Sequence, residues 1–189
     1  MGNLILIRHS EPEWGRHAPP SEWLLTDRGR YRATLLGEYL RNRRIDRIIS
    51  SAETKAIQTA EIAASAAELK YQVSDPKLNE HNREGENPLS SAERRQIIVK
   101  SLRNPHELIY GNETIAGALA RFREGLELHV DSSLDEPVAV VSHGTVISAF
   151  AESELEIDAV ELWDNFGLPG LIEFEWPNGD TILDQRAFE

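Results

Sequence analysis

The stretch that decides the fold of this chain is Leu4-Ile5-Leu6-Ile7-Arg8-His9-Ser10. Its four consecutive apolar residues, two of them β-branched, predict a short strand that is buried on both faces of a sheet. Glu11-Pro12 follows, and because proline cannot continue a central strand, the strand ends here. In an open α/β sheet, ligands bind beyond the carboxyl ends of the strands, so Arg8 and His9 are well placed to act on an anion. The alternative is a strand that ends in polar residues at the surface.

The composition is that of an ordinary globular protein. The 189 residues suit a single domain over residues 1–189, and 40% of them are hydrophobic and 28% charged. The formal net charge of −12 argues against nucleic-acid binding, which needs a basic surface. The absence of cysteine excludes disulfides, thiolate metal sites and a cysteine nucleophile. Residues 4–7 are too short for a signal-peptide core and no run of about 18 apolar residues occurs, so we expect a cytoplasmic protein without a membrane partner.

Strand-like and helix-like segments alternate along the chain. Apolar runs predict strands at residues 47–51, 71–73, 138–141 and 170–175, and a last short strand after the hairpin signal Asn178-Gly179. Helix caps and apolar periodicity predict helices near residues 26–42, 53–70, 90–102, 114–130, 146–151 and 158–163. Residues 11–25 and 74–89 are irregular in composition and are predicted to form loops. The alternation predicts an α/β fold, a three-layer α/β/α sandwich with a mostly parallel central sheet.

Three of the predicted strands end in residues that suit phosphate chemistry. They terminate in Arg8-His9, Ser50-Ser51 and Ser142-His143-Gly144. Parallel strands place such ends at one edge of the sheet, so these groups can converge although they lie far apart in sequence. The last two strands lead directly into helices, whose N-terminal amides add donors for an anion. Together with Lys55, one turn into its helix, they predict phosphoryl chemistry, and no regular spacing of carboxylates indicates a metal site.

Six blocks of sequence carry a resemblance to a known family. Residues 6–10 are similar to an Arg-His-Gly signature, and residues 25–29 to a Leu-Thr-x-x-Gly helix opening. Residues 50–60 resemble Ser-Ser-Pro-Leu-x-Arg-Ala-x-Gln-Thr-Ala, residues 78–80 resemble Leu-x-Glu, and residues 111–114 loosely resemble Gly-Glu-Ser. Residues 140–147 match a second-histidine block. Because these blocks occur in family order, the chain is identified as similar to the histidine phosphatase superfamily, the phosphoglycerate mutase-like group.

The resemblance implies a phosphoglycerate mutase-like fold and a covalent mechanism that needs no metal or cofactor. His9 would attack the phosphorus of a small phosphorylated metabolite, giving a phosphohistidine that water then hydrolyses. Glu80 would protonate the leaving oxygen and then act as the base on water. His143 would join the catalytic set, and the phosphate oxygens would be held by Arg8, Ser10, Lys55, His143 and Gly144.

The chain also departs from the family pattern. Ser10 replaces a glycine, so its hydroxyl either donates to phosphate or fills space. Lys55 stands where the family has arginine, and a lysine cannot form a planar bidentate fork on phosphate. After Glu80 the Gly-x-Trp-Glu-Gly pattern is missing, so the acid is Glu80, Glu84 or neither, with Glu80 the leading candidate.

These departures keep other functions open. One is a non-catalytic member of the family that binds a phospholigand or a protein, and another is a phosphoglycerate mutase-type phosphotransferase. Substrate identity would depend on the loops at residues 11–25 and 74–89, in which His17 and His81 are expected at the surface. The edge of the C-terminal hairpin would allow two copies to pair as a homodimer.

Overall fold

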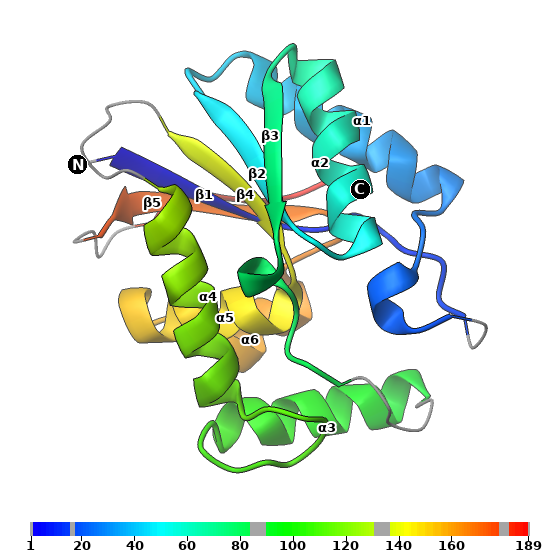
Figure 1. Cartoon of the computed structure of the whole chain (residues 1–189), viewed down its shortest axis with the longest axis vertical. Coiled ribbons are helices and arrows are strands. Elements are labelled where there is room, and N and C mark those ends of the chain that lie inside the picture. Colours follow the sequence, from blue (N-terminus) through cyan, green and yellow to red (C-terminus); the bar gives the residue numbers. More distant parts are fainter. Residues whose placement is uncertain (1, 16–17, 84–89, 131–136, 178–181, 189) are drawn as a thin grey trace.

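A six-stranded sheet forms the middle of the molecule (Figure 1). We describe a computed structural model, which covers residues 2–15, 18–83, 90–130, 137–177 and 182–188. The strand order is β3-β2-β4-β1-β5-β6; the first four strands are parallel, whereas β5 and β6 are antiparallel to their neighbours. The strands are β1 (Gly2–Arg8), β2 (Arg47–Ser51), β3 (Lys70–Asp75), β4 (Val138–Ser142), β5 (Gly170–Trp176) and β6 (Ile182–Ala187).

Helices cover both faces of this sheet. Two 3-10 turns, η1 (Pro20–Glu22) and η2 (Pro76–Leu78), precede α1 and follow β3. The α-helices are α1 (Asp27–Arg41), α2 (Thr54–Ala67), α3 (Ser91–Arg103), α4 (Ile115–His129), α5 (Gly144–Leu155) and α6 (Ala159–Asn165). Helices α1 and α2 lie on one face and α4, α5 and α6 on the other, while α3 lies away from the sheet (Figure 1). The predicted three-layer α/β/α sandwich with a mostly parallel sheet is confirmed.

The apolar run in β1 explains these layers. Alternate residues of a strand point to opposite faces of a sheet. Leu4 and Leu6 accordingly pack into the core with α4 and α5, whereas Ile5 and Ile7 pack with α1 and α2. All four side chains are 0% exposed, and burying each one contributes about 1.5–3 kcal/mol. The segment of β1 that is covered by helices on both faces, residues 4–7, is therefore apolar throughout.

The register of β1 and β4 sets the place of the predicted site. The two strands are parallel with Arg8 opposite Ser142, so their carboxyl ends are level. The pairing extends one step further, because the backbone N–H of His9 donates to the carbonyl of Ser142 at 2.9 Å. His9 and His143 therefore leave the sheet side by side.

Some element boundaries differ from those predicted. α2 ends at Ala67 because Glu68 adopts a left-handed backbone with φ 59°, and β3 then runs to Asp75. α5 begins at Gly144, directly after β4, and continues to Leu155. The predicted loops contain η1 and η2, and the hairpin turn Asn178-Gly179 lies outside the described residues, although its flanking strands pair as expected. Within the described ranges, no helix is long and apolar enough to cross a membrane.

Candidate active site

His9 is buried just after the end of β1, and its hydrogen bond indicates which ring nitrogen carries the proton. Its side chain is 5% exposed, and Nδ1 lies 2.7 Å from the carbonyl oxygen of Ser10. Because a carbonyl can only accept a hydrogen bond, Nδ1 carries the proton and Nε2 presents a lone pair. Burial lowers the pKa of His9 well below 6.5, and the nearby Lys55 and His143 lower it further. The imidazole is therefore neutral at neutral pH and able to act as a nucleophile.

His143 lies against His9, with 5.2 Å between the two ring centroids and 59° between the ring planes. Its side chain is fully buried, and Nε2 is 2.6 Å from the hydroxyl of Ser51 at the end of β2. Burial, and then Lys55, hold its pKa well below 6.5, although Glu80 acts in the opposite direction. The ends of β1, β2 and β4 thus converge as the parallel arrangement requires.

The Arg8 guanidinium lies between the start of α5 and α6. Nη1 donates to the backbone carbonyl of Trp163 at 3.2 Å, and Cζ is 5.5 Å from the centre of that indole ring. Gly144 makes room for it, since a Cβ there would stand 2.9 Å from Nε of Arg8. Burial lowers the pKa of Arg8 to about 10, against the raising effect of Glu80, so the group stays charged at neutral pH. Its Nε is buried and has no hydrogen-bond partner among the described residues.

The Glu80 carboxylate occupies the N-terminus of α5. It accepts hydrogen bonds from the backbone N–H groups of Thr145 and Val146 at 3.2 and 3.3 Å, and Arg83 lies 3.3 Å away. Burial raises the pKa of Glu80, but Arg83, His143 and the N–H of His81 outweigh burial and lower it overall. Glu80 is therefore ionised in this structure. An anion bound beside it would raise its pKa, which is what a proton donor needs.

Lys55 is buried beside the two histidines. Its side chain is 6% exposed, and Nζ donates to the carbonyl of Pro20 at 2.7 Å and to the carboxylate of Glu53. Its positive charge lowers the pKa of both His9 and His143. It is therefore not an exposed helix residue.

Ser10 serves the fold at this position. Its hydroxyl donates to the carbonyl of Gly29 at 2.7 Å, and its backbone N–H donates to the hydroxyl of Thr59 at 2.9 Å. A serine hydroxyl has one proton, and both donors of Ser10 already have acceptors within the protein. In this structure both donors of Ser10 are therefore engaged within the protein, and a phosphate-binding role for Ser10 stays a prediction.

Three residues at the site escaped sequence analysis. Glu53 contacts Lys55, Arg83 contacts Glu80, and Trp163 supports Arg8. Glu53 lies two residues before Lys55, and Arg83 lies three residues after Glu80, so both contacts are local in sequence. The charges of Glu53 and Arg83, each close to a matched motif position, offered a local signal.

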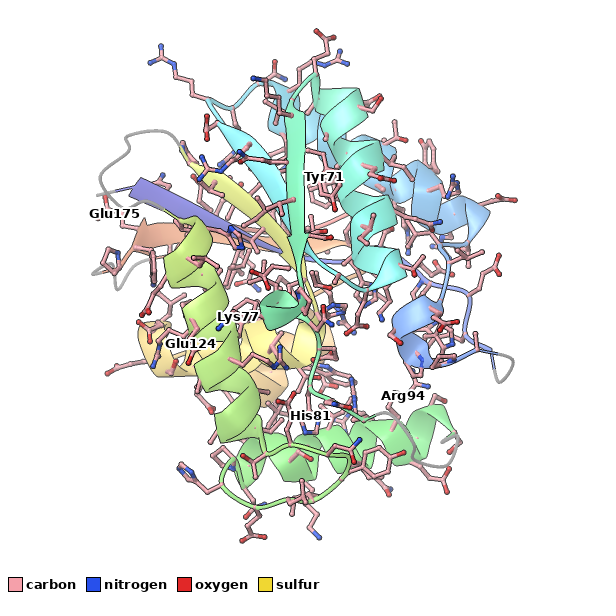
Figure 2. All side chains as sticks on the ribbon, in the orientation of Figure 1. Tyr71, Lys77, His81, Arg94, Glu124 and Glu175 are labelled. Carbon is pink, nitrogen blue, oxygen red and sulfur yellow. The ribbon has the colours of Figure 1, made fainter. Side chains whose placement is uncertain are left out.

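The alternatives in the loops have different outcomes. Glu84 and His17 lie outside the described residues. His81 lies on the linker between η2 and α3 (Figure 2), but it is 5% exposed and its Nε2 is 2.6 Å from the carbonyl of Glu113, so the predicted surface position is wrong. Its burial follows from packing of the linker against the segment before α4.

The loop at residues 11–25 contacts α3 through aromatic stacking. Arg94 of α3 points toward this loop (Figure 2), with its Cζ 4.5 Å from the ring centre of Trp14 and 5.3 Å from that of Trp23. The two indole rings meet edge to face at 5.1 Å. Because Pro20 of the same loop accepts from Lys55, this segment also borders the site.

A cavity of about 260 Å³ lies on another side of Arg8, lined by Arg8, Arg32, Asp164, Gly167, Leu168 and Phe188. Its lining shares Arg8 with the candidate site but includes neither His9 nor His143. Among the residues that the structure describes, no three His, Asp or Glu side chains are grouped as metal ligands would be.

The fold and this cluster define an α/β protein of the phosphoglycerate mutase-like class, with two adjacent histidines at the carboxyl ends of its parallel strands. The chain belongs to the histidine phosphatase superfamily (branch 1), whose pattern it matches over residues 4–185.

Curated relatives have similar lengths and phosphate-related names. Phosphoserine phosphatase 1 of Hydrogenobacter thermophilus is 28% identical over 175 residues, covering 88% of this chain and 82% of that protein. The probable phosphoglycerate mutase GpmB of Yersinia pestis is 31% identical over 176 residues, covering 84% of this chain and 77% of that protein.

Solved structures show the same fold. A phosphoserine phosphatase of Entamoeba histolytica, in complex with 3-phosphoglyceric acid, has a TM-score of 0.76 at 22% identity, covering 100% of this chain and 98% of that one. YhfR of Bacillus stearothermophilus has a TM-score of 0.74 at 23% identity, covering 97% and 96% of the two chains.

Proposed function

We propose that this protein is a phosphomonoesterase that hydrolyses a small phosphorylated metabolite through a phosphohistidine on His9. The observation that carries the proposal is the state of His9. Its Nδ1 proton is directed at the carbonyl of Ser10 and its lowered pKa keeps the ring neutral, so Nε2 is free to attack. The names of the relatives, which include both phosphatases and mutases, agree with chemistry on phosphate esters.

In the first step, Nε2 of His9 forms a bond to phosphorus as the bond from phosphorus to the ester oxygen breaks. Arg8, Lys55, His143 and the backbone N–H of Gly144 stabilise the charge on the three remaining oxygens. Glu80, which takes up a proton when the dianionic phosphate binds beside it, gives that proton to the leaving oxygen. The products are the free alcohol and phosphohistidine.

In the second step, water attacks the phosphohistidine. The Glu80 carboxylate takes a proton from the water as the new bond to phosphorus forms, and the bond between phosphorus and Nε2 breaks. Inorganic phosphate leaves, and His9 returns to the neutral state in which its Nδ1 proton is bound to Ser10. The cycle needs no group beyond those of the chain and water.

The test is turnover of 4-nitrophenyl phosphate. We expect wild-type protein to release nitrophenolate, and His9→Ala to abolish release while retaining the native fluorescence of the tryptophans. His106→Ala, which removes an exposed histidine, is the matched control and should keep full activity. Saturable phosphate binding without turnover, unchanged in His9→Ala, would identify a non-catalytic binding protein instead. Transfer of labelled phosphate to a second metabolite rather than to water would identify a mutase.

The leaving group tests the role of Glu80. Nitrophenolate is a good leaving group without protonation, whereas an alkoxide must be protonated as it leaves. Glu80→Gln should therefore slow hydrolysis of an alkyl phosphate much more than that of 4-nitrophenyl phosphate, by the 10²–10⁴-fold typical of general acid catalysis. Glu84→Gln is the companion variant, and a larger leaving-group effect there than in Glu80→Gln would move the role of acid to Glu84.

A further inference from the structure

Glu53 is a buried carboxylate in the site to which the proposed reaction assigns no step. Its side chain is 8% exposed and forms an ion pair with Lys55. Its Oε1 accepts from the backbone N–H of Glu80 at 2.8 Å and lies 3.5 Å from Nε2 of His143. The Glu53 side chain thus contacts a candidate phosphate-binding residue, one histidine of the site and the backbone of Glu80, the candidate general acid.

The local backbone makes this contact with Lys55 possible. Residues two apart within a helix do not face each other. Glu53, however, precedes the first residue of α2 and has extended backbone angles, φ −77° and ψ 138°. Its backbone N–H is held by the hydroxyl of Ser51 at 3.1 Å. The carboxylate therefore turns to the same side as Lys55, toward the end of the sheet.

Glu53 restricts the direction of the Lys55 ammonium group. A lysine has three N–H donors on a flexible stem and lacks the rigid fork of arginine. Here one N–H is donated to the carbonyl of Pro20 and another to the carboxylate of Glu53. With two acceptors fixed, the direction of the third N–H is also fixed. The third N–H of Lys55 can then donate to a phosphate oxygen in one direction, although the flexible lysine side chain does not itself fix that direction.

The charge of Glu53 also balances the site. Burial raises the pKa of Glu53, but the ion pair with Lys55 and the N–H of Glu80 outweigh burial and lower it overall, so the carboxylate is ionised at neutral pH. Leaving one charge of a buried pair without its partner is strongly unfavourable. Glu53 therefore keeps Lys55 in the site while no phosphate is bound.

We propose that Glu53 is a positioning residue for phosphoryl transfer, which holds the Lys55 ammonium group in the direction of the phosphate oxygens. The proposal rests on the proposed function, because it assigns Lys55 to the phosphate. It also explains how lysine serves at a position where a bidentate cation would otherwise be needed.

The experiment compares Glu53→Gln, Lys55→Met and the double variant with wild type. The amide keeps the shape of the side chain and an acceptor for the N–H of Glu80, but it loses the charge that holds Lys55. We expect kcat for 4-nitrophenyl phosphate to fall on the order of 10²-fold in Glu53→Gln, as for a misplaced catalytic group. Binding of inorganic phosphate, measured by calorimetry, should stay equal or become tighter, because a negative charge has been removed. Glu61→Gln, an exposed glutamate on α2, is the matched control.

The double variant separates positioning from general structural damage. If Glu53 acts through Lys55, Glu53→Gln should lower kcat little further once Lys55 is methionine. Equal losses in both backgrounds, or a parallel fall in kcat, phosphate affinity and melting temperature, would overturn the proposal.

The calorimetric arm keeps the two proposals distinguishable. If the wild-type protein turns over no phosphate ester, the proposed function fails. Glu53→Gln should then still bind inorganic phosphate at least as tightly as wild type, and weaker binding in this variant would overturn the role of Glu53 as well.

Discussion

Lowering the pH should destabilise this protein through the same histidines that form its site. The side chains of His9 and His143 are buried, and burial holds the pKa of each well below the ordinary value of 6.5. Between that value and the lower native pKa, the unfolded chain binds a proton at each histidine and the native chain does not. The unfolded state then carries more protons, so the free energy of unfolding falls as the pH falls.

The magnitude follows from linkage. For one histidine that stays neutral in the native state, a change from about pH 7.5 to about pH 5.5 costs on the order of 1 kcal/mol of unfolding free energy. His9 and His143 together therefore cost on the order of 2–3 kcal/mol, a large fraction of the roughly 5–15 kcal/mol of a typical domain. Glu53 and Glu80, whose pKa values are lowered from 4.5, add to the loss only at more acidic pH.

Urea unfolding followed by the fluorescence of the four tryptophans measures this effect at both pH values. His9→Gln, which keeps an amide donor for the Ser10 carbonyl, should reduce the pH-dependent loss by roughly half, on the order of 1 kcal/mol, relative to wild type. His106→Gln removes an exposed histidine and should leave the loss as in wild type. An equal loss in wild type and His9→Gln would show that His9 titrates alike in the folded and unfolded chains, which would refute the reasoning.

Two further substitutions test contacts around the site. In Gly144→Ala the new Cβ would stand 2.9 Å from Nε of Arg8 and would displace the guanidinium. We therefore expect kcat/KM for an aryl phosphate to fall on the order of 10²-fold. Unchanged kinetics would contradict the close packing of Arg8 against Gly144. Arg121 of α4 donates to the backbone carbonyl of Glu80 at 3.1 Å and to three other backbone carbonyls in η2 and the linker that follows it, those of Pro76, Lys77 and Asn79. Arg121→Met should therefore lower the free energy of unfolding by about 2 kcal/mol and reduce kcat more than it raises KM. Arg123→Met, on the same helix but more exposed, is the control. Equal losses of unfolding free energy and kcat in the two variants would argue against a specific role for the Arg121 hydrogen bonds.

Much of the fold follows from patterns within short segments. Four apolar residues before Arg8 predict a central strand because both faces of such a strand are covered. Helix starts are equally local, since the hydroxyls of Thr26, Ser90 and Thr114 each accept from a backbone N–H three residues later. The misplaced boundary of α2 has a local cause as well, the left-handed backbone at Glu68, but no glycine marks it in the sequence.

The direction of individual side chains was less predictable. A serine after His9 suggested a phosphate donor, yet its hydroxyl donates to Gly29 of α1. His81 sits in a polar stretch, yet it is buried because the linker packs against the segment before α4. In both cases the partner is remote in sequence, and periodicity carries no information about remote partners.

The sequence by itself determined that an α/β sheet would bring Arg8-His9 and His143 to one edge, because parallel strands with covered faces must end together. Only the tertiary structure decided the chemistry of that edge. The neutrality of both histidines depends on burial, which packing alone produces. The hydrogen bond of Glu53 to the linker at Glu80 depends on how the start of α2 meets a segment 27 residues further along the chain. Such contacts are set by the packing of separate elements, so the sequence alone did not show that the Lys55 side chain is buried.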